Sequence, residues 1–413
     1  MNTRTTAHRR MLATIALATG TLLGLSACAG AASGDTDAGA PDETRTGAAT
    51  DASATGPRIA LTYDGGLLVL DGATLETLAD VELPGFNRVN PAGDGRSVMV
   101  STAEGFQVLD TGAGSADEPE LTDLVFEAPS PGHVVRHHGR TVLFADGSGE
   151  TTIFDSAELL ADAGAGRLPE TETVPSPEAH HGVSIELADG TLLTTIGTPD
   201  ARTGVRALDA DRVETSRNEQ CPSVHGEGAV RGEVAVFGCS DGVLVYDDGA
   251  FTKIAAPDAY GRTGNAYVTE TSPVMVGDYN ADPDAEGYVL TALTVVDTET
   301  KSSRVVPLPE GVGYTWRDVA RTADDDAIVL GTDGALHVLD VTTGEFGASF
   351  PVIEAWEGPA EWQDAHPALV VDGGTAYVTD PASSAIHAVD VATGELIATG
   401  ELPAVPNEIA VTG

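Results

Sequence analysis

A short phrase that ends in aspartate recurs along this chain, and it constrains the fold more than any other feature. Between the copies lie alternating apolar and polar runs separated by Asp-Gly, Gly-Gly and Thr-Gly turns, which are typical of β-strands. A repeat of about 40 to 55 residues that contains several strands predicts an all-β propeller. The eight copies end at Asp71, Asp110, Asp155, Asp209, Asp247, Asp297, Asp340 and Asp390.

The last full unit, residues 366–403, shows four strands in each repeat: an inner strand, a second strand after Asp-Gly-Gly, the strand that ends in aspartate, and an outer strand after "ATGE". The chain ends supply one further unit. Residues 406–413 are an inner strand without partners, and residues 57–83 contain three strands without an inner one. Joined, they would close the ring and remove its open edges. The sequence therefore predicts eight four-stranded blades, with seven as the alternative if one unit is degenerate.

The first 56 residues are predicted to lie outside the propeller. Arg4, Arg9 and Arg10 precede the apolar run "MLATIALATGTLLGL", as in an export signal. "LSAC" then resembles the bacterial lipobox, in which the cysteine, here Cys28, is acylated; a plain secretory signal is the alternative. We expect a lipoprotein signal peptide at 1–27, acylated Cys28 and a flexible acidic tether at 28–56, and the β-propeller at 57–413. The protein would be extracytoplasmic and held on the outer face of the cell membrane by its lipid anchor only.

The charge of the chain limits the partners it can bind, and its cysteine content predicts a disulfide. The formal net charge of −43 argues against nucleic acid, because phosphate binding needs Lys and Arg. It suits cations or simple solubility. Besides Cys28 the chain has only Cys221 and Cys239, and an even pair in an oxidising compartment predicts a disulfide.

Histidine is concentrated at one position of the repeat. Four of the eight inner strands start at histidine, although the whole chain has ten histidines in 413 residues. Strand starts converge at one mouth of the central channel, and neutral imidazoles are preferred zinc ligands. This predicts a metal site made of His133, His181, His225 and His366; polar strand ends at a solvated mouth are the alternative. The eight starts are Asn87, His133, His181, His225, Asn265, Arg317, His366 and Asn407.

Other polar residues near these starts are secondary candidates. His180 is an alternative ligand to His181, and Glu227 and Asp364 are close enough in sequence to join the metal or to orient an imidazole. His337 and His387 occupy matching places in two third strands and are predicted to be packing or surface residues. His137 and His138 are predicted to be solvated turn residues, with a secondary cation site as the alternative.

Four segments resemble the AztD-type zinc metallochaperones: "GHVVRHHGRTVLFADGSGE", "EAHHGVSIELADGTLL", "CPSVHGEGAVRGEVAVFGCSDGVLVYDDG" and "WQDAHPALVVDGGTAYVTD". Those proteins are exported propellers that bind zinc with histidines and pass it to the solute-binding protein of a zinc ABC importer. The resemblance implies Zn²⁺ as cargo, ligands among His133, His181, His225 and His366, and no enzymatic activity. Family members can carry a His-rich segment near the mature N-terminus, whereas residues 28–56 contain no histidine.

Two other functional classes remain open from the sequence. A membrane-tethered propeller could serve as a protein-interaction module without tight metal binding. A three-histidine zinc site with an open position could also activate water, as in a zinc hydrolase. The chain lacks a G-x-S-x-G motif, and its three tryptophans do not match the Trp-rich repeats of quinone-dependent dehydrogenases.

Overall fold

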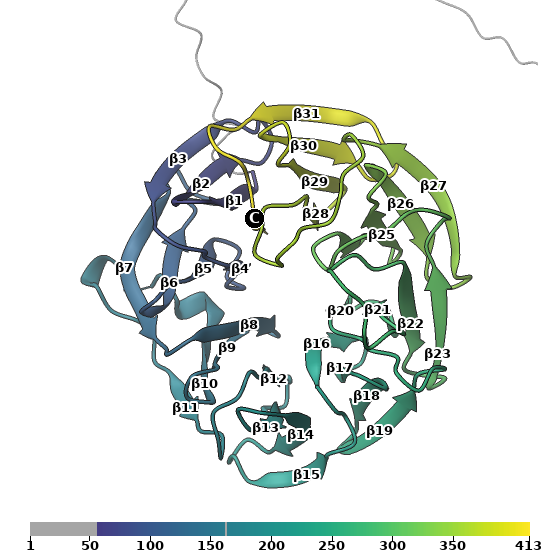
Figure 1. Ribbon diagram of the computed structural model, residues 1–413. Helices are drawn as coiled ribbons and strands as arrows, with labels where there is room; N and C mark the ends of the chain where they lie inside the picture. The colour runs from purple at the N-terminus through teal and green to yellow at the C-terminus, as the bar shows by residue number, and fades with distance from the viewer. Residues whose placement is uncertain (1–55, 162) are drawn as a thin grey trace, which may run out of the picture. The chain divides into compact units, whose positions relative to one another are not determined.

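The computed structural model describes residues 56–161 and 163–413, and these form a ring of eight four-stranded antiparallel sheets (Figure 1). The predicted eight-bladed propeller is therefore confirmed. The signal peptide, Cys28 and the tether lie outside the described residues. No helix among the described residues has the length and hydrophobicity needed to cross a membrane.

Each blade has the same order from the central channel outward. The inner strands are β4 (Val89–Pro91), β8 (Pro131–His137), β12 (Ser184–Glu186), β16 (His225–Val230), β20 (Ala266–Tyr267), β24 (Val319–Arg321), β28 (Leu369–Asp372) and β32 (Ile409–Thr412). The second strands are β5 (Ser97–Ser101), β9 (Arg140–Ala145), β13 (Leu192–Gly197), β17 (Val234–Cys239), β21 (Val274–Tyr279), β25 (Ala327–Leu330), β29 (Thr375–Asp380) and β1 (Arg58–Tyr63).

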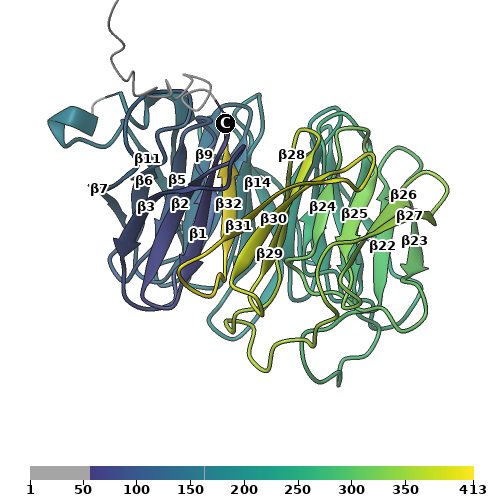
Figure 2. The same cartoon turned by 90° about the horizontal axis from the view of Figure 1, so that it is seen from above.

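The third strands carry the repeated phrase, and the fourth strands form the outer rim (Figure 2). The third strands are β6 (Gly105–Asp110), β10 (Glu150–Asp155), β14 (Arg202–Leu208), β18 (Gly242–Asp247), β22 (Ala292–Asp297), β26 (Ala335–Asp340), β30 (Ala385–Asp390) and β2 (Gly66–Asp71). The outer strands are β7 (Glu120–Glu127), β11 (Glu172–Val174), β15 (Glu214–Asn218), β19 (Ala250–Ala255), β23 (Ser302–Pro307), β27 (Glu345–Pro351), β31 (Leu396–Glu401) and β3 (Thr77–Glu82).

The aspartate that ends the repeated phrase stops the third strand by capping the turn that follows it. Asp297 Oδ1 accepts hydrogen bonds from the backbone N–H groups of Glu299 and Thr300, both at 2.9 Å. Asp340 does the same for Thr342 and Thr343. An Asx turn of this kind reverses the chain toward the outer strand, which explains why the residue recurs at the same place in the repeat.

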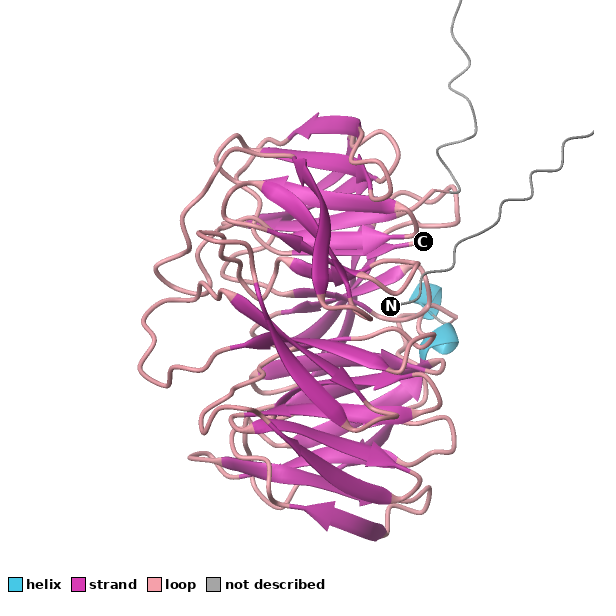
Figure 3. Cartoon of the chain, turned by 90° about the vertical axis from the view of Figure 1, so that its right-hand side faces the viewer, coloured by secondary structure: helices cyan, strands magenta, loops and turns pink. Residues whose placement is uncertain are grey.

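The ring is held together by apolar contact between neighbouring blades. In the final blade, β1 and β2 are buried along nearly their whole length, whereas the outer strand β3 has only exposed and half-buried residues. One core cluster joins Ile59 and Leu61 of the final blade to Tyr377 and Ile386 of the blade before it. Each sheet thus covers the face of the next one, and the loops project from the two ends of the ring (Figure 3).

The C-terminal strand closes the ring as predicted. β32 pairs with β1 in antiparallel register from Arg58↔Thr412 to Leu61↔Ile409. Two short 3-10 helices, η2 (Ser156–Glu158) and η3 (Ala163–Ala165), lie in the connection between β10 and β11. The predicted disulfide is also present: Cys221 and Cys239 are joined with a Cα–Cα distance of 4.9 Å, and both residues are fully buried. It ties the loop before β16 to the end of β17.

Removing residues 406–413 tests the contribution of ring closure. The deletion would leave β1 as an open edge and would uncover Ile59 and Leu61, which are fully buried. We expect the melting temperature, measured by circular dichroism, to fall by about 10 °C or more. Removing Gly413 alone leaves β32 intact and should change it by less than about 2 °C. Equal melting of the two variants would show that closure contributes nothing.

Candidate metal centre

Three histidines from consecutive blades meet at the channel. One ring nitrogen from each of His133, His181 and His225 lies within 4.8 Å of those of the other two, and the ring centroids are 5.0 to 5.1 Å apart. His133 belongs to β8, His225 begins β16, and His181 lies three residues before β12. The inner strands β8, β12 and β16 contact one another in that order. The strand starts thus bring together side chains from neighbouring blades that lie 48 and 44 residues apart in the chain.

Each of these histidines has a glycine as a neighbour in the chain, and the backbone conformation at that glycine directs the imidazole toward the other two. Gly132 and Gly226 are the extra residues of β-bulges, next to His133 and His225, and Gly226 has a φ of +63°. A Cβ on either glycine would collide with neighbouring atoms at 2.2 and 2.6 Å, and one on Gly182 would collide at 2.5 Å. Bulges redirect side chains at functional sites. His366 has alanine and proline as its neighbours instead.

All three imidazoles use Nδ1 to contact a fixed acceptor. Two of these acceptors are backbone carbonyl oxygens, which can only accept, so the ring must donate from Nδ1. The third is a carboxylate. In each neutral ring Nε2 then carries a lone pair, as metal binding requires. The contacts are His133 to Gly182 O at 2.8 Å, His225 to Gly264 O at 2.5 Å and His181 to Asp146 Oδ2 at 2.5 Å.

The spacing of the free nitrogens fits a zinc ion. Nε2 of His181 and Nε2 of His225 are 3.1 Å apart. Two nitrogens that lie 2.0 to 2.1 Å from one tetrahedral ion are about 3.3 to 3.4 Å apart. With both protons held on Nδ1, two lone pairs face each other across this gap, an arrangement that is repulsive unless a cation lies between them. The donor set and the distance between these two nitrogens therefore fit a tetrahedral ion, with His133 as the third protein ligand and one position open.

Burial keeps two of these rings neutral. Desolvation lowers the pKa of His225 to about 3 and the pKa of His133 well below its usual value. For His133, electrostatic repulsion from His225, His181 and Arg88 adds to the effect of burial. A ring that resists protonation does not have to lose a proton before it can bind metal, so protons compete weakly at these two positions.

Asp146 is the one contact residue that the sequence analysis did not single out. It follows β9 in an Asp-Gly pair and was read only as a turn residue. Its Oδ2 contacts His181 Nδ1, while its Oδ1 accepts a hydrogen bond from the backbone N–H of Gly182 at 3.3 Å. One carboxylate thus orients the His181 ring and positions the loop that carries it. In the sequence this residue is part of the "ADG" in the first segment of the resemblance, and an Asp-Gly pair alone indicates only a turn.

His366 does not join the three-histidine cluster. Its blade is four places round the ring from that of His181, on the opposite side of the channel. Nδ1 contacts the carbonyl oxygen of Asp364 at 2.7 Å, and the residue is only 2% exposed. The prediction of a four-histidine site is therefore corrected to three. Asp364 instead caps a local turn by accepting from the N–H of Glu361 at 2.9 Å.

The two remaining candidate residues, His180 and Glu227, also lie outside the three-histidine cluster. His180 is buried with both ring nitrogens occupied, by Glu178 O and by Thr195 Oγ1, each at 2.9 Å. It packs the loop and is not free to replace His181. Glu227 lines the same cavity as the histidines, where burial raises its pKa to about 7, but its carboxylate is not part of the metal-ligand group.

The remaining histidines lie away from the starts of the inner strands. His337 and His387 lie within β26 and β30, as expected of packing residues. His138 is exposed, but the prediction for His137 is wrong. This residue is 7% exposed, and its two ring nitrogens contact Glu233 at 3.1 Å and Glu270 at 3.0 Å.

Proton release on zinc binding tests the neutral state of the buried rings. At pH 5.5, three imidazoles with the usual pKa of 6.5 would release about 2.7 protons per metal ion. Because the pKa values of His133 and His225 are lowered, those rings are already deprotonated at this pH. We expect at most about one proton per zinc, measured by titration calorimetry in buffers of different ionisation enthalpy. A value near three would contradict this account.

Comparisons with known proteins agree with this fold. No family model matches the chain. The curated zinc chaperone AztD of Citrobacter koseri is 27% identical over 280 residues, which are 66% of this chain and 63% of that protein. The crystal structure of apo AztD from the same organism has a TM-score of 0.71 at 22% identity and covers 86% of this chain and 97% of that one.

A more distant propeller shares the fold alone. The dihydro-heme d1 dehydrogenase NirN has a TM-score of 0.58 at 12% identity, over 90% of this chain and 77% of that one. This chain therefore resembles the AztD zinc chaperones in sequence over 66% of its length and in the architecture of its propeller, which confirms the resemblance predicted from its histidine and cysteine segments.

Proposed function

We propose that this protein is an extracytoplasmic zinc metallochaperone that binds Zn²⁺ through His133, His181 and His225. It delivers the ion to the solute-binding protein of a zinc ABC importer. The single observation that carries the proposal is that the three imidazoles each bring a ring nitrogen within 4.8 Å of the other two, while each Nδ1 contacts an acceptor. The similarity to a protein named as a zinc chaperone supports zinc as the metal and transfer as the task.

The site combines secure binding with access, and a chaperone needs both. His133 and His225 are half-buried on rigid inner strands, whereas the side chain of His181 is 47% exposed and sits in a loop. With three protein ligands, the fourth position stays open to an incoming ligand from an acceptor protein. A ligand exchange that begins at this position and then displaces the exposed imidazole would pass the ion on without releasing it into solution.

Membrane attachment is part of the same proposal. It rests on the resemblance of residues 25–28 to a lipobox and on the apolar run before them. A lipid anchor would keep the chaperone beside a membrane importer, and the acidic residues 28–56 would give it reach. The negative charge of the chain would also raise the local concentration of cations.

Three histidines with an open position would also suit a zinc hydrolase, so the two functions need a direct comparison. The zinc-loaded protein can be assayed with p-nitrophenyl acetate. We propose the chaperone role. We therefore expect the zinc-loaded wild-type protein to hydrolyse the ester no faster than the His181→Ala variant does. Steady turnover above that level would favour the enzyme.

Replacing the ligands one at a time is the main test. Alanine at His133, His181 or His225 removes an imidazole from the metal and should lower zinc affinity more than 100-fold, measured by competition with a chromophoric chelator. Asp146→Ala removes the acceptor of His181 Nδ1 but none of the ligands, and it should lower zinc affinity by about 10- to 100-fold.

Two matched control variants distinguish the three-histidine site from the four-histidine site that the sequence predicted. His366→Ala and Asp364→Asn change residues that lie outside the three-histidine cluster and should keep zinc affinity within about threefold of the wild-type value. If they weaken zinc as much as His181→Ala, while circular dichroism shows the fold intact, the assignment of ligands is wrong. Retention of tight zinc by all three alanine variants would show that zinc binds elsewhere, and absence of tight zinc binding by the wild-type protein would favour the interaction module instead.

Cys28→Ser tests the anchor. Without the thiol no acyl chain can be attached, so we expect the protein to move from the membrane fraction to the extracytoplasmic soluble fraction of its cells. Immunoblotting of the two fractions measures this, with His181→Ala as a control that should stay with the membrane. An unchanged distribution would contradict lipid anchoring.

A further inference from the structure

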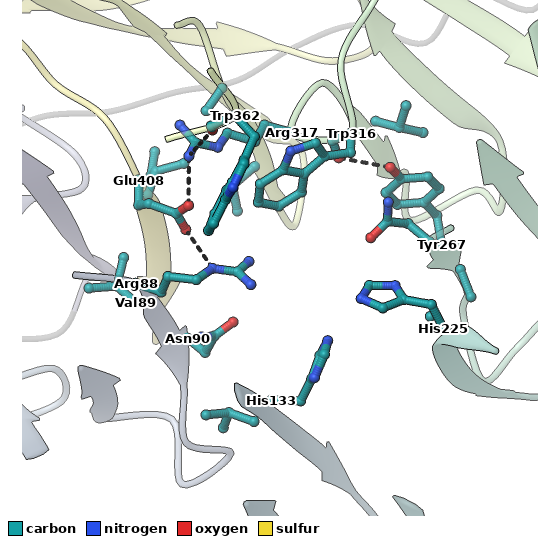
Figure 4. Close-up of a pocket in the computed structure, with 18 of the residues that line it drawn as sticks. Arg88, Val89, Asn90, His133, His225, Tyr267, Trp316, Arg317, Trp362 and Glu408 are labelled. Atoms are coloured by element: carbon teal, nitrogen blue, oxygen red, sulfur yellow. Dashed lines mark hydrogen bonds and ion pairs between the residues drawn. The ribbon is translucent and has the colours of Figure 1, made fainter. Parts of the chain in front are cut away.

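The wall of the cavity opposite the histidines carries a group that metal binding alone does not explain. The cavity has a volume of about 510 Å³ and is lined by the three histidines on one side. Arg88, Trp316 and Trp362 line the other side. In Figure 4 the side chain of Arg88 reaches from the start of β4 into the cavity, with its guanidinium directed toward His133 and His225.

This guanidinium is incompletely paired. Its only acidic neighbour within the described residues is Glu408, whose Oε2 lies 3.6 Å from Nε of Arg88. The same carboxylate already forms a closer ion pair with Arg317 at 2.8 Å. Two arginines thus share one carboxylate. Across residues 56–161 and 163–413, the Arg88 guanidinium makes no hydrogen bond, and its Nε is buried with only this longer contact to Glu408.

The position of Arg88 is unfavourable for a metal site on its own. Its guanidinium lines the same cavity as His133 and is directed toward that ring (Figure 4). A divalent ion bound to the ring would be repelled by this positive charge. The ring of Trp316 fixes the guanidinium in place, with its carbon 5.0 Å from the ring centroid. An anion between the two positive groups would turn this repulsion into attraction.

We propose that Arg88 and the three-histidine site together bind a small organic carboxylate, which takes the open position on the metal and accepts hydrogen bonds from the Arg88 guanidinium. This inference rests on the proposed zinc function. The planar fork of arginine matches a carboxylate, and carboxylate oxygens are zinc ligands.

The other lining residues favour a carboxylate over a phosphate. Glu408 lies beside Arg88 and would oppose a doubly charged anion. The faces of Trp316 and Trp362 suit the apolar part of an organic acid. The protein would therefore hold its zinc as a ternary complex, and the bound acid would shield the ion until an acceptor displaces it.

Acetate is the probe for this site. Zinc affinity is measured by chelator competition at constant ionic strength without acetate and with 50 mM acetate, after correction for zinc–acetate complexes in solution. A carboxylate site with a dissociation constant of about 5 mM predicts a rise in apparent zinc affinity of about tenfold in the wild-type protein. Cobalt(II) in place of zinc should show a saturable change in its visible spectrum over the same acetate range.

Arg88→Gln should reverse the pattern. Without acetate, zinc affinity should be unchanged or up to about tenfold higher, because a repelling charge is gone. With acetate the gain should fall below about twofold, and the cobalt spectrum should no longer respond. Arg231→Gln is the matched control, since Arg231 is an exposed arginine that pairs with Glu299 away from the cavity, and it should behave as wild type.

The two proposals fail in different ways. If acetate changes neither the zinc affinity nor the cobalt spectrum of the wild-type protein, or if Arg88→Gln responds to acetate as the wild type does, the carboxylate site is wrong while zinc binding stands. If His181→Ala retains wild-type zinc affinity, the metal site itself is wrong, and with it the carboxylate inference. A melting curve of Arg88→Gln checks that the variant is folded.

Discussion

Mutual coverage of the blades is the constraint on which the rest of this structure depends. A four-stranded sheet whose middle strands are buried on both faces cannot exist alone in water, and here each sheet is covered by its two neighbours. The arrangement works only if the ring closes, which the pairing of β32 with β1 achieves. Closure also fixes the inner strands as a circle of parallel starts around one channel. The proposed metal site is a consequence of that circle, because three neighbouring starts bring three imidazoles close together.

Hydrogen bonds to Nδ1 then hold the three neighbouring imidazoles in the orientation that the proposed metal binding requires. Imidazoles at a channel mouth would usually rotate and take up protons. Here His133 and His225 are held through Nδ1 by backbone carbonyls of neighbouring blades, and His181 is held by Asp146. Burial lowers the pKa of the two most enclosed rings, so they are ready to accept a cation in mildly acidic surroundings. The order of the site thus comes from contacts between blades and not from any one strand.

Local charge in the channel differs from the charge of the whole molecule. The chain carries a formal net charge of −43, which attracts cations over long distances. Within the cavity, however, Arg88 and Arg317 share Glu408, so the wall opposite the histidines carries excess positive charge. A long-range field that gathers metal ions and a short-range field that calls for an anionic co-ligand can coexist, because the surface charges are screened by solvent and the cavity charges much less so.

The sequence by itself determined the features that arise from local patterns. Alternation and the turn-capping aspartates defined eight blades, and residues 406–413 identified the closing strand, because strand periodicity and Asx turns are properties of a few consecutive residues. The repeat also placed His133, His181, His225 and His366 at equivalent positions. Only the tertiary structure decided that His366 is excluded, since its blade lies opposite that of His181. It also revealed Asp146, which acts on a residue 35 positions later in the chain. A sequence repeat predicts where a residue lies within its blade. It does not predict the distance between residues of different blades or the direction of a side chain, because these depend on bulges and on contacts between blades.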